Sequence, residues 1–425
     1  MTFAAATQAR AREPAGLRIS ANKIVGFFFF IFVVCGAFDK IQPSPYDFAS
    51  LVAMPVWFVF GFRARRMFVP YFFLMTVYLL SGFITLIPYW NEPDPVMFEL
   101  QSFYLYVTGL FFALFFAERT LDRGALLLKA YTASCLVGAV AAIAGFFDIG
   151  GSQESFATWG RASGTFKDAN VFGSYIILGA LYLTQTLMLR QTRRVGLVAT
   201  LLLIILAGLF LSFSRGSWGA FVFAASMMIG MALMTTPDRK ARNNIVVGVI
   251  LAGVVLAILV AALMSIDSVR ELAAQRLQPV GEEYDDPRFF NQMRSLPMLL
   301  ERPLGFGPLR FRLWFDLEPH SSFVNGFASY GWVGGVAFIL LVGATAFVGF
   351  RLCFARSPYQ TMAQVVWPSL LVFFLQGFQI DIDHWRHVYL MMGAIWGFEA
   401  ARYHWLLEQR RAAERLPRRN AIVAQ

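Results

Sequence analysis

The basic residue with the most unusual surroundings is Arg215, the only charge in the apolar run 195–234. An arginine there is costly unless it lies at a membrane interface or meets an anion. Ser214 can cap a helix that begins at Gly216. The free N–H groups of a helix N-terminus attract phosphate, as the fork of a guanidinium group does. An arginine that only fixes a hairpin at the membrane surface is the equal alternative.

Three further basic residues lie in predicted loops. Arg161 and Lys167 make the segment 148–170 basic, where surface solvation is the plain alternative. Arg288 follows the acidic residues of 282–286, and a local ion pair is its plain alternative. The predicted topology places these residues and Arg215 on one membrane face, where together they could neutralise a diphosphate.

His320 stands where the largest loop returns to the membrane. Histidine has an unperturbed pKa of about 6.5, so it can act as a general base or donate a hydrogen bond to phosphate. A single histidine at the start of a helix is more often a helix cap or an interfacial group than a catalytic residue. Gly331 and Gly334, downstream in the same apolar run, predict close backbone packing or a break in a helix.

A last polar cluster occupies the short segment 381–387. Asp381 and Asp383 form an Asp-x-Asp pair, and His384 and His387 would share a face of a helix. This arrangement suggests acceptor binding by Asp381, Asp383 and His384. A metal site and a solvated interfacial turn are the alternatives, and no other loop supplies an obvious further metal ligand.

The composition requires a membrane protein. Hydrophobic residues make up 58% of the chain and charged residues 15%, with a mean hydropathy of +0.58. So little polar surface cannot coat a soluble globule of this size. The net charge of +10 comes from bases in short loops between apolar runs, which excludes a nucleic-acid reading. The three cysteines lie in or beside apolar runs without pairing or ligand spacing.

The apolar runs predict an all-α integral membrane protein. A bilayer core of about 30 Å requires about 20 apolar residues per helix. The 12 predicted spans are 21–38, 47–62, 67–88, 97–117, 125–147, 171–190, 195–213, 216–234, 244–264, 321–350, 362–380 and 386–404. Arginines concentrate in the loops of one side, so both termini are predicted to be cytoplasmic.

The predicted domains follow from these spans: a tail 1–20, helices over 21–264 with an external loop 148–170, a large periplasmic loop 265–320, helices over 321–404 and a basic tail 405–425. Residues 268–277 of the large loop have helical periodicity. Asp286-Pro287 predicts the start of a second loop helix.

Several of these segments carry a family resemblance. His320-Ser321, nine residues and then Gly331-x-x-Gly334 resembles the histidine motif of bacterial O-antigen ligases. Three other segments are similar to the same family: the arginine turn 214–216, Arg288 together with 301–307, and Arg161, Gly164 and Asn170 ahead of a span. The related O-antigen and exopolysaccharide polymerases share these features.

The resemblance implies a metal-independent, inverting glycosyltransferase of the GT-C-like class that uses no cofactor. Its donor would be a glycan on undecaprenyl diphosphate in the inner membrane. Its acceptor would be a sugar hydroxyl on lipid A-core or, for a polymerase, on a lipid-linked repeat unit. Arg215 and Arg288, with Arg161 and Lys167, would hold the diphosphate at the periplasmic face, and His320 would be the base or a further phosphate contact.

A transporter of lipid-linked oligosaccharides is the rival class. It predicts charges at mid-membrane, paired broken helices and an inverted repeat. The charges here cluster on one face instead. A scaffold without catalytic activity in polysaccharide assembly is the third alternative.

Overall fold

The computed structural model describes residues 21–60, 66–276 and 282–423, except the side chains of 60, 66, 282–288 and 415–423. In these residues the fold is helical apart from one short hairpin. The elements in chain order are α1 (Ala21–Val34), η1 (Cys35–Ala37), α2 (Pro45–Phe60), η2 (Arg66–Phe68), α3 (Val69–Leu86), η3 (Ile87–Tyr89), α4 (Pro93–Phe116), α5 (Thr120–Phe146), α6 (Gln153–Phe156), β1 (Ala157–Thr158), β2 (Arg161–Ala162), α7 (Ala169–Tyr175), α8 (Ile177–Met188), α9 (Val195–Leu211), α10 (Arg215–Thr235), α11 (Arg239–Met264), α12 (Asp267–Arg276), α13 (Glu282–Leu300), α14 (Arg312–Phe315), α15 (Ser322–Phe354), α16 (Gln360–Gln376) and α17 (Arg386–Val423).

Seven helical segments of the described chain are long and apolar enough to cross a membrane: 69–89, 93–116, 120–146, 169–188, 215–235, 239–264 and 322–354. The prediction of an all-α membrane protein is therefore confirmed. α11 is the clearest membrane-spanning candidate, because it is the most apolar of the seven segments and is almost unburied within the protein. The other five predicted spans coincide with α1, α2, α9, α16 and the first part of α17, and their crossing stays a prediction.

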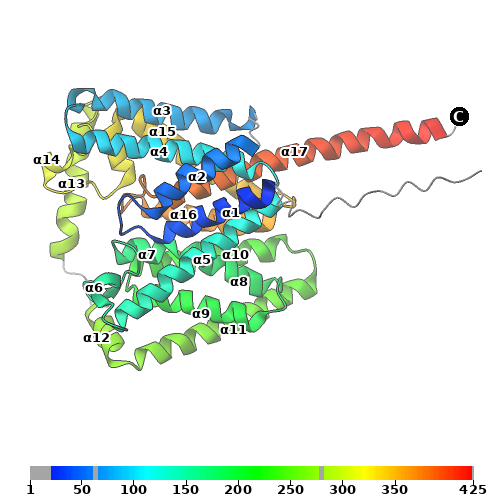
Figure 1. Ribbon diagram of the computed structural model, residues 1–425, viewed down its shortest axis with the longest axis horizontal. Helices are drawn as coiled ribbons and strands as arrows, with labels where there is room; N and C mark the ends of the chain where they lie inside the picture. Colours follow the sequence, from blue (N-terminus) through cyan, green and yellow to red (C-terminus); the bar gives the residue numbers. More distant parts are fainter. Residues whose placement is uncertain (1–20, 61–65, 277–281, 424–425) are drawn as a thin grey trace, which may run out of the picture.

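Most helices run along the long axis of the molecule, and α6, α12, α13 and α14 gather at the left in Figure 1. α4 packs on α17, and α3 packs on α15. The first contact is close because glycines face phenylalanines: a Cβ on Gly393 or Gly397 would lie about 2.5–2.6 Å from the Cβ atom of Phe112 or Phe116. This packing sets the position of the start of α17, which carries much of the site described below.

α15 contains a break at Gly331, as the glycine spacing predicts. Gly331 has φ 68° and ψ −173°, a conformation that is essentially restricted to glycine. The break frees the N–H of Trp332 to donate to the carbonyl of Pro303 at 2.9 Å. The carbonyl of Tyr330 accepts instead from the Ser81 hydroxyl of α3 at 2.6 Å. The break therefore docks the segment after α13 onto the membrane helices.

Gly331→Ala is expected to lower the free energy of unfolding by about 1–3 kcal/mol, the cost of holding a non-glycine residue in this backbone region. The added Cβ would also lie 2.6 Å from the Pro303 oxygen. Thermal unfolding in detergent measures the effect. Gly343→Ala on the same helix is the control, because no atom lies within 4 Å of its Cβ position and it should lose nothing. Equal stability of the two variants would contradict the strained break.

The helices of the large loop match the sequence only in part. α12 covers the predicted 268–277 closely. α13 begins at Glu282, so the predicted helix start at Asp286-Pro287 is wrong and both residues lie inside the helix. The acidic residues before Pro287 suit the positive end of a helix dipole, which favours the earlier start.

Candidate functional site

Loops from distant parts of the chain meet at one end of the molecule. We call this end, formed by 38–44, 147–168, 212–216, 265–276, 282–321 and 377–385, the loop end. The Ser322 N–H donates to the Gly377 carbonyl at 2.8 Å, and the Lys40 N–H donates to the Thr165 carbonyl at 3.0 Å. The first bond joins the start of α15 to the end of α16. The second joins the loop before α2 to the loop before α7. All the predicted site residues with described side chains lie at this end.

Arg215 is the first residue of α10 and its side chain is exposed. The Ser214 hydroxyl accepts from the Ser217 N–H at 3.3 Å, which confirms the predicted cap. Within the described chain, no carboxylate lies within ion-pair distance of Arg215. An exposed guanidinium beside a helix N-terminus can bind an anion without first breaking an internal contact.

Arg161 lies behind the same turn and is only 6% exposed. Its guanidinium donates to the Ser212 carbonyl at 2.8 Å and to the Asn170 side-chain oxygen at 2.7 Å. These bonds hold the turn before Arg215 against the start of α7. Phosphate binding by Arg161 stays a prediction, and the observed contacts give it a positioning role.

His320 lies between the large loop and α15, with φ 48° in the left-handed region. Its Nδ1 is 3.8 Å from Oδ2 of Asp381, and the two side chains are 41% and 32% exposed. The Pro319 carbonyl before it accepts from Gln292 of α13 at 2.7 Å, and Ser321 caps α15. A histidine opposed by a carboxylate can be held in one orientation and can take up a proton. Nothing in the spacing of the sequence pointed to this pair.

Asp383, unlike Asp381, is almost fully buried. Its carboxylate accepts from Ser322 at 3.0 Å and from Asn325 at 2.8 Å, and lies 3.1 Å from Nδ1 of His384. Burial alone would raise the pKa of Asp383, but the bonds from His384 and Ser322 hold it below its usual range. Asp383 therefore joins the start of α15 to the segment before α17.

His384 completes this buried network. Its Nε2 lies 3.0 Å from the Ser102 hydroxyl of α4, and its ring packs on Phe98. His384 precedes α17, which begins at Arg386, so the predicted shared helix face of His384 and His387 is wrong. The described residues contain no group of three or more His, Cys, Asp or Glu side chains that could hold a metal ion.

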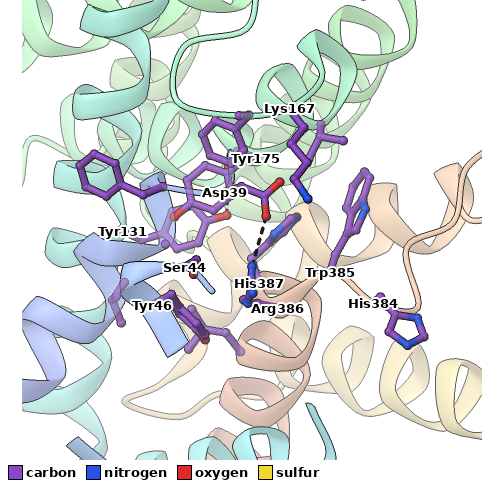
Figure 2. A pocket seen from close by; sticks show the side chains of 16 residues that line it. Asp39, Ser44, Tyr46, Tyr131, Lys167, Tyr175, His384, Trp385, Arg386 and His387 are labelled. Atoms are coloured by element: carbon purple, nitrogen blue, oxygen red, sulfur yellow. Dashed lines mark hydrogen bonds and ion pairs between the residues drawn. The ribbon is translucent and has the colours of Figure 1, made fainter. Parts of the chain in front are cut away.

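A cavity of about 170 Å³ opens beside this network, between α1, α5, α7 and the start of α17. Figure 2 shows Lys167, Asp39 and His387 directed into it, while the ring of His384 points away from these side chains. Arg386 lines the cavity too and donates to Asp39 at 3.2 Å and to Asp47 at 2.8 Å. Lys167 lies at this cavity, and its predicted role in binding a diphosphate stays a prediction.

Arg288 belongs to α13, but its side chain is outside the described residues, so its predicted role is untested. The segment after α13 is held against α4. Arg310 forms an ion pair with Glu92, and Arg312 lies 3.3 Å from Asp94. Phe306, Phe311 and Phe315 of this segment pack together with Leu299 of α13 and Ala328 of α15. Residues 306–312 of this segment thus lie against the connection between α3 and α4 and the start of α4.

Comparison with known proteins gives one family. Residues 199–339, which contain Arg215, Arg288 and His320, match the family described as O-Antigen ligase. Members of this family are glycosyltransferase-like enzymes with lipid-linked glycan substrates. No curated protein matches the chain. The matched region ends before Asp381, so the carboxylate that lies 3.8 Å from His320 comes from outside it.

Proposed function

We propose that this chain, whose residues 199–339 match the O-antigen ligase family, transfers a glycan from undecaprenyl diphosphate to a sugar hydroxyl of lipid A-core. The observation that carries the proposal is the coincidence of that match with two features of the loop end. These are the exposed Arg215 at a helix N-terminus and the His320–Asp381 pair. Both belong to a protein with helices long and apolar enough to cross a membrane, where a polyprenyl carrier would lie.

In the proposed reaction the acceptor hydroxyl loses its proton to His320 as its oxygen bonds to the anomeric carbon. The bond from that carbon to the diphosphate breaks, and the diphosphate leaves with the electron pair. Arg215 and Arg288 stabilise the charge that develops on the diphosphate. Attack opposite the leaving group inverts the anomeric centre. Arg161 supports Arg215 by holding its turn in place.

The charge pattern supports a location in the inner membrane, with the loop end toward the periplasm and both termini in the cytoplasm. A polymerase of lipid-linked repeat units would use the same donor chemistry with another acceptor. A ligase and a polymerase differ only in the acceptor, so the test must identify the molecule that receives the glycan.

Deletion of the gene in its host, with and without a wild-type copy, tests the proposal. Loss of a ligase is expected to leave long polymer on the lipid carrier and bare lipid A-core outside. Loss of a polymerase would instead leave single repeat units on the carrier and one-unit caps outside. Extraction of the carrier-linked pool and gel analysis of surface polysaccharide measure both. Normal levels of both products in the deleted strain would contradict either form of the proposal.

A further inference from the structure

The side of α13 that faces away from the rest of the protein is apolar. The side chains of Phe290, Met293, Leu296 and Leu300 are 59%, 66%, 43% and 74% exposed. They recur at intervals of three or four residues, so they lie along one face of the helix. The other side is packed, because Leu299 is buried in an apolar cluster with the segment that follows α13. A contiguous exposed apolar face indicates a surface that binds something.

α12, the other long helix of the same loop, exposes polar residues instead. Arg270, Glu271 and Gln275 are exposed, whereas Val269 and Ala273 are buried. This is the pattern expected of a helix whose outer side lies in water. The apolar face of α13 is therefore not a general property of the large loop.

The apolar face of α13 continues the exposed apolar side of α15. Residues 322–330 are buried or half-buried, but Trp332 and Val333 after the break are 42% and 62% exposed. The indole N–H of Trp332 donates to the Leu299 carbonyl at 2.8 Å, and its main-chain N–H donates to the Pro303 carbonyl at 2.9 Å. The two apolar surfaces therefore meet at Trp332, at the end of α13.

The length of α15 gives the level of Trp332 in the membrane. Arg351 is the only charged residue of α15. A bilayer core of about 30 Å takes about 20 residues of helix, so counting back from Arg351 places Trp332 at the edge of the core on the side of the loop end. Tryptophan is enriched at this level of membrane proteins. α13, which runs across the direction of α3 and α4 in Figure 1, therefore ends where acyl chains meet headgroups.

We propose that α13 is an interfacial helix whose face of Phe290, Met293, Leu296 and Leu300 is embedded in the bilayer leaflet at the loop end. Helices of this kind bury their apolar face about 5–10 Å into the boundary between headgroups and acyl chains. The guanidinium of Arg294 lies 5.4 Å from the centre of the Phe290 ring, beside this face, where it can meet anionic headgroups. This lipid contact goes beyond the proposed glycan transfer and does not depend on it.

The packed side of α13 holds the segment that leads to His320. Asn291 donates to the Phe315 carbonyl at 3.0 Å, and Gln292 donates to the Pro319 carbonyl at 2.7 Å. Lipid contact on one side of α13 thus sets the depth of His320 relative to the membrane surface. This consequence rests on the proposed function, in which His320 acts on a substrate held in the membrane.

Fluorescence quenching tests the lipid contact. The full chain, with its three cysteines replaced by alanine, carries one probe on Met293→Cys or, as the control on α12, on Gln275→Cys. Each nanodisc of phosphatidylcholine and phosphatidylglycerol holds one copy. A lipid with a nitroxide near the top of its acyl chain is expected to quench most of the fluorescence at 293 and little at 275, and aqueous iodide is expected to do the reverse. A benzophenone amino acid at 293 of the otherwise natural chain should crosslink to lipid, which tests the contact without removing cysteines.

The other outcomes are distinct. Iodide quenching as strong at 293 as at 275 would place the face in water and overturn the proposal. Protection from both quenchers would mean that protein covers the face, and would overturn it as well. Loss of lipid quenching in discs that hold two copies would assign the face to a second copy instead of lipid. Lipid quenching at 293, in a protein whose wild-type form transfers no glycan, would reject the proposed function and leave the lipid contact standing.

Met293→Asp tests the link to His320. A charge on the embedded face is expected to lower kcat by about tenfold or more, because a small displacement of a catalytic group is costly. Gln275→Asp adds the same charge to the exposed side of α12 and should keep the wild-type rate. In the His320→Ala background Met293→Asp should have little further effect, because both changes act through one residue. Full activity of Met293→Asp, or equal losses with and without His320, would overturn the link.

Discussion

Arg215→Ala is expected to lower the rate of glycan transfer by about 10²–10³-fold, the usual effect of removing one group that stabilises developing negative charge. Arg215 is exposed, starts α10 and has no carboxylate partner in the described chain. Its guanidinium is therefore free for substrate. The measurement is the initial rate with an undecaprenyl diphosphate-linked donor in nanodiscs, with kcat and KM determined separately.

Arg215→Lys separates charge from geometry. Lysine keeps the positive charge but loses the bidentate fork, so an intermediate rate is expected. Arg270→Ala is the control, because Arg270 is an exposed arginine of α12 whose ion pair with Asp267 lies at the surface. Its rate should stay close to that of the wild type. Full activity of Arg215→Ala would remove the diphosphate role from the proposal.

The features that sequence predicted well are local. The apolar runs locate the helices because burial in lipid depends on the hydropathy of a single segment. The turn at Arg215 was predicted because one charge and one capping serine interrupt a double-length run. The pair Gly331 and Gly334 predicts close backbone packing or a break in the helix, and the structure has the break at Gly331. Each of these predictions depends on residues that lie within a few positions of the predicted feature.

The features that sequence missed depend on packing between distant segments. Asp383 and Ser322 are 61 residues apart, and only the contact of α15 with α16 and α17 brings them together. The same contact opposes Asp381 to His320, whereas the sequence assigned Asp381 to the acceptor. Lys167 meets Arg386 and Asp39 at a cavity for the same reason. No periodicity encodes such pairs, since any loop at this face could have supplied them.

The His320–Asp381 pair leads to the second prediction. His320→Ala should lower kcat by about 10²–10⁴-fold if His320 is the general base. Asp381→Ala should lower it by about tenfold or more, because the carboxylate 3.8 Å from Nδ1 no longer orients the ring. Asp381→Asn removes the charge but keeps the size of the side chain, so its kcat should fall between those of the wild type and Asp381→Ala. Single-turnover transfer rates with saturating acceptor measure these effects on the chemical step.

The double variant decides whether Asp381 acts through His320. If it does, Asp381→Ala has little further effect once His320 is alanine, because residues that act as a unit are not additive. If Asp381 binds the acceptor independently, the two losses multiply. Asp267→Ala, which removes only an exposed surface pair of α12, controls for a general loss of negative charge at the loop end. Multiplying losses would return Asp381 to the acceptor role that its sequence position suggested.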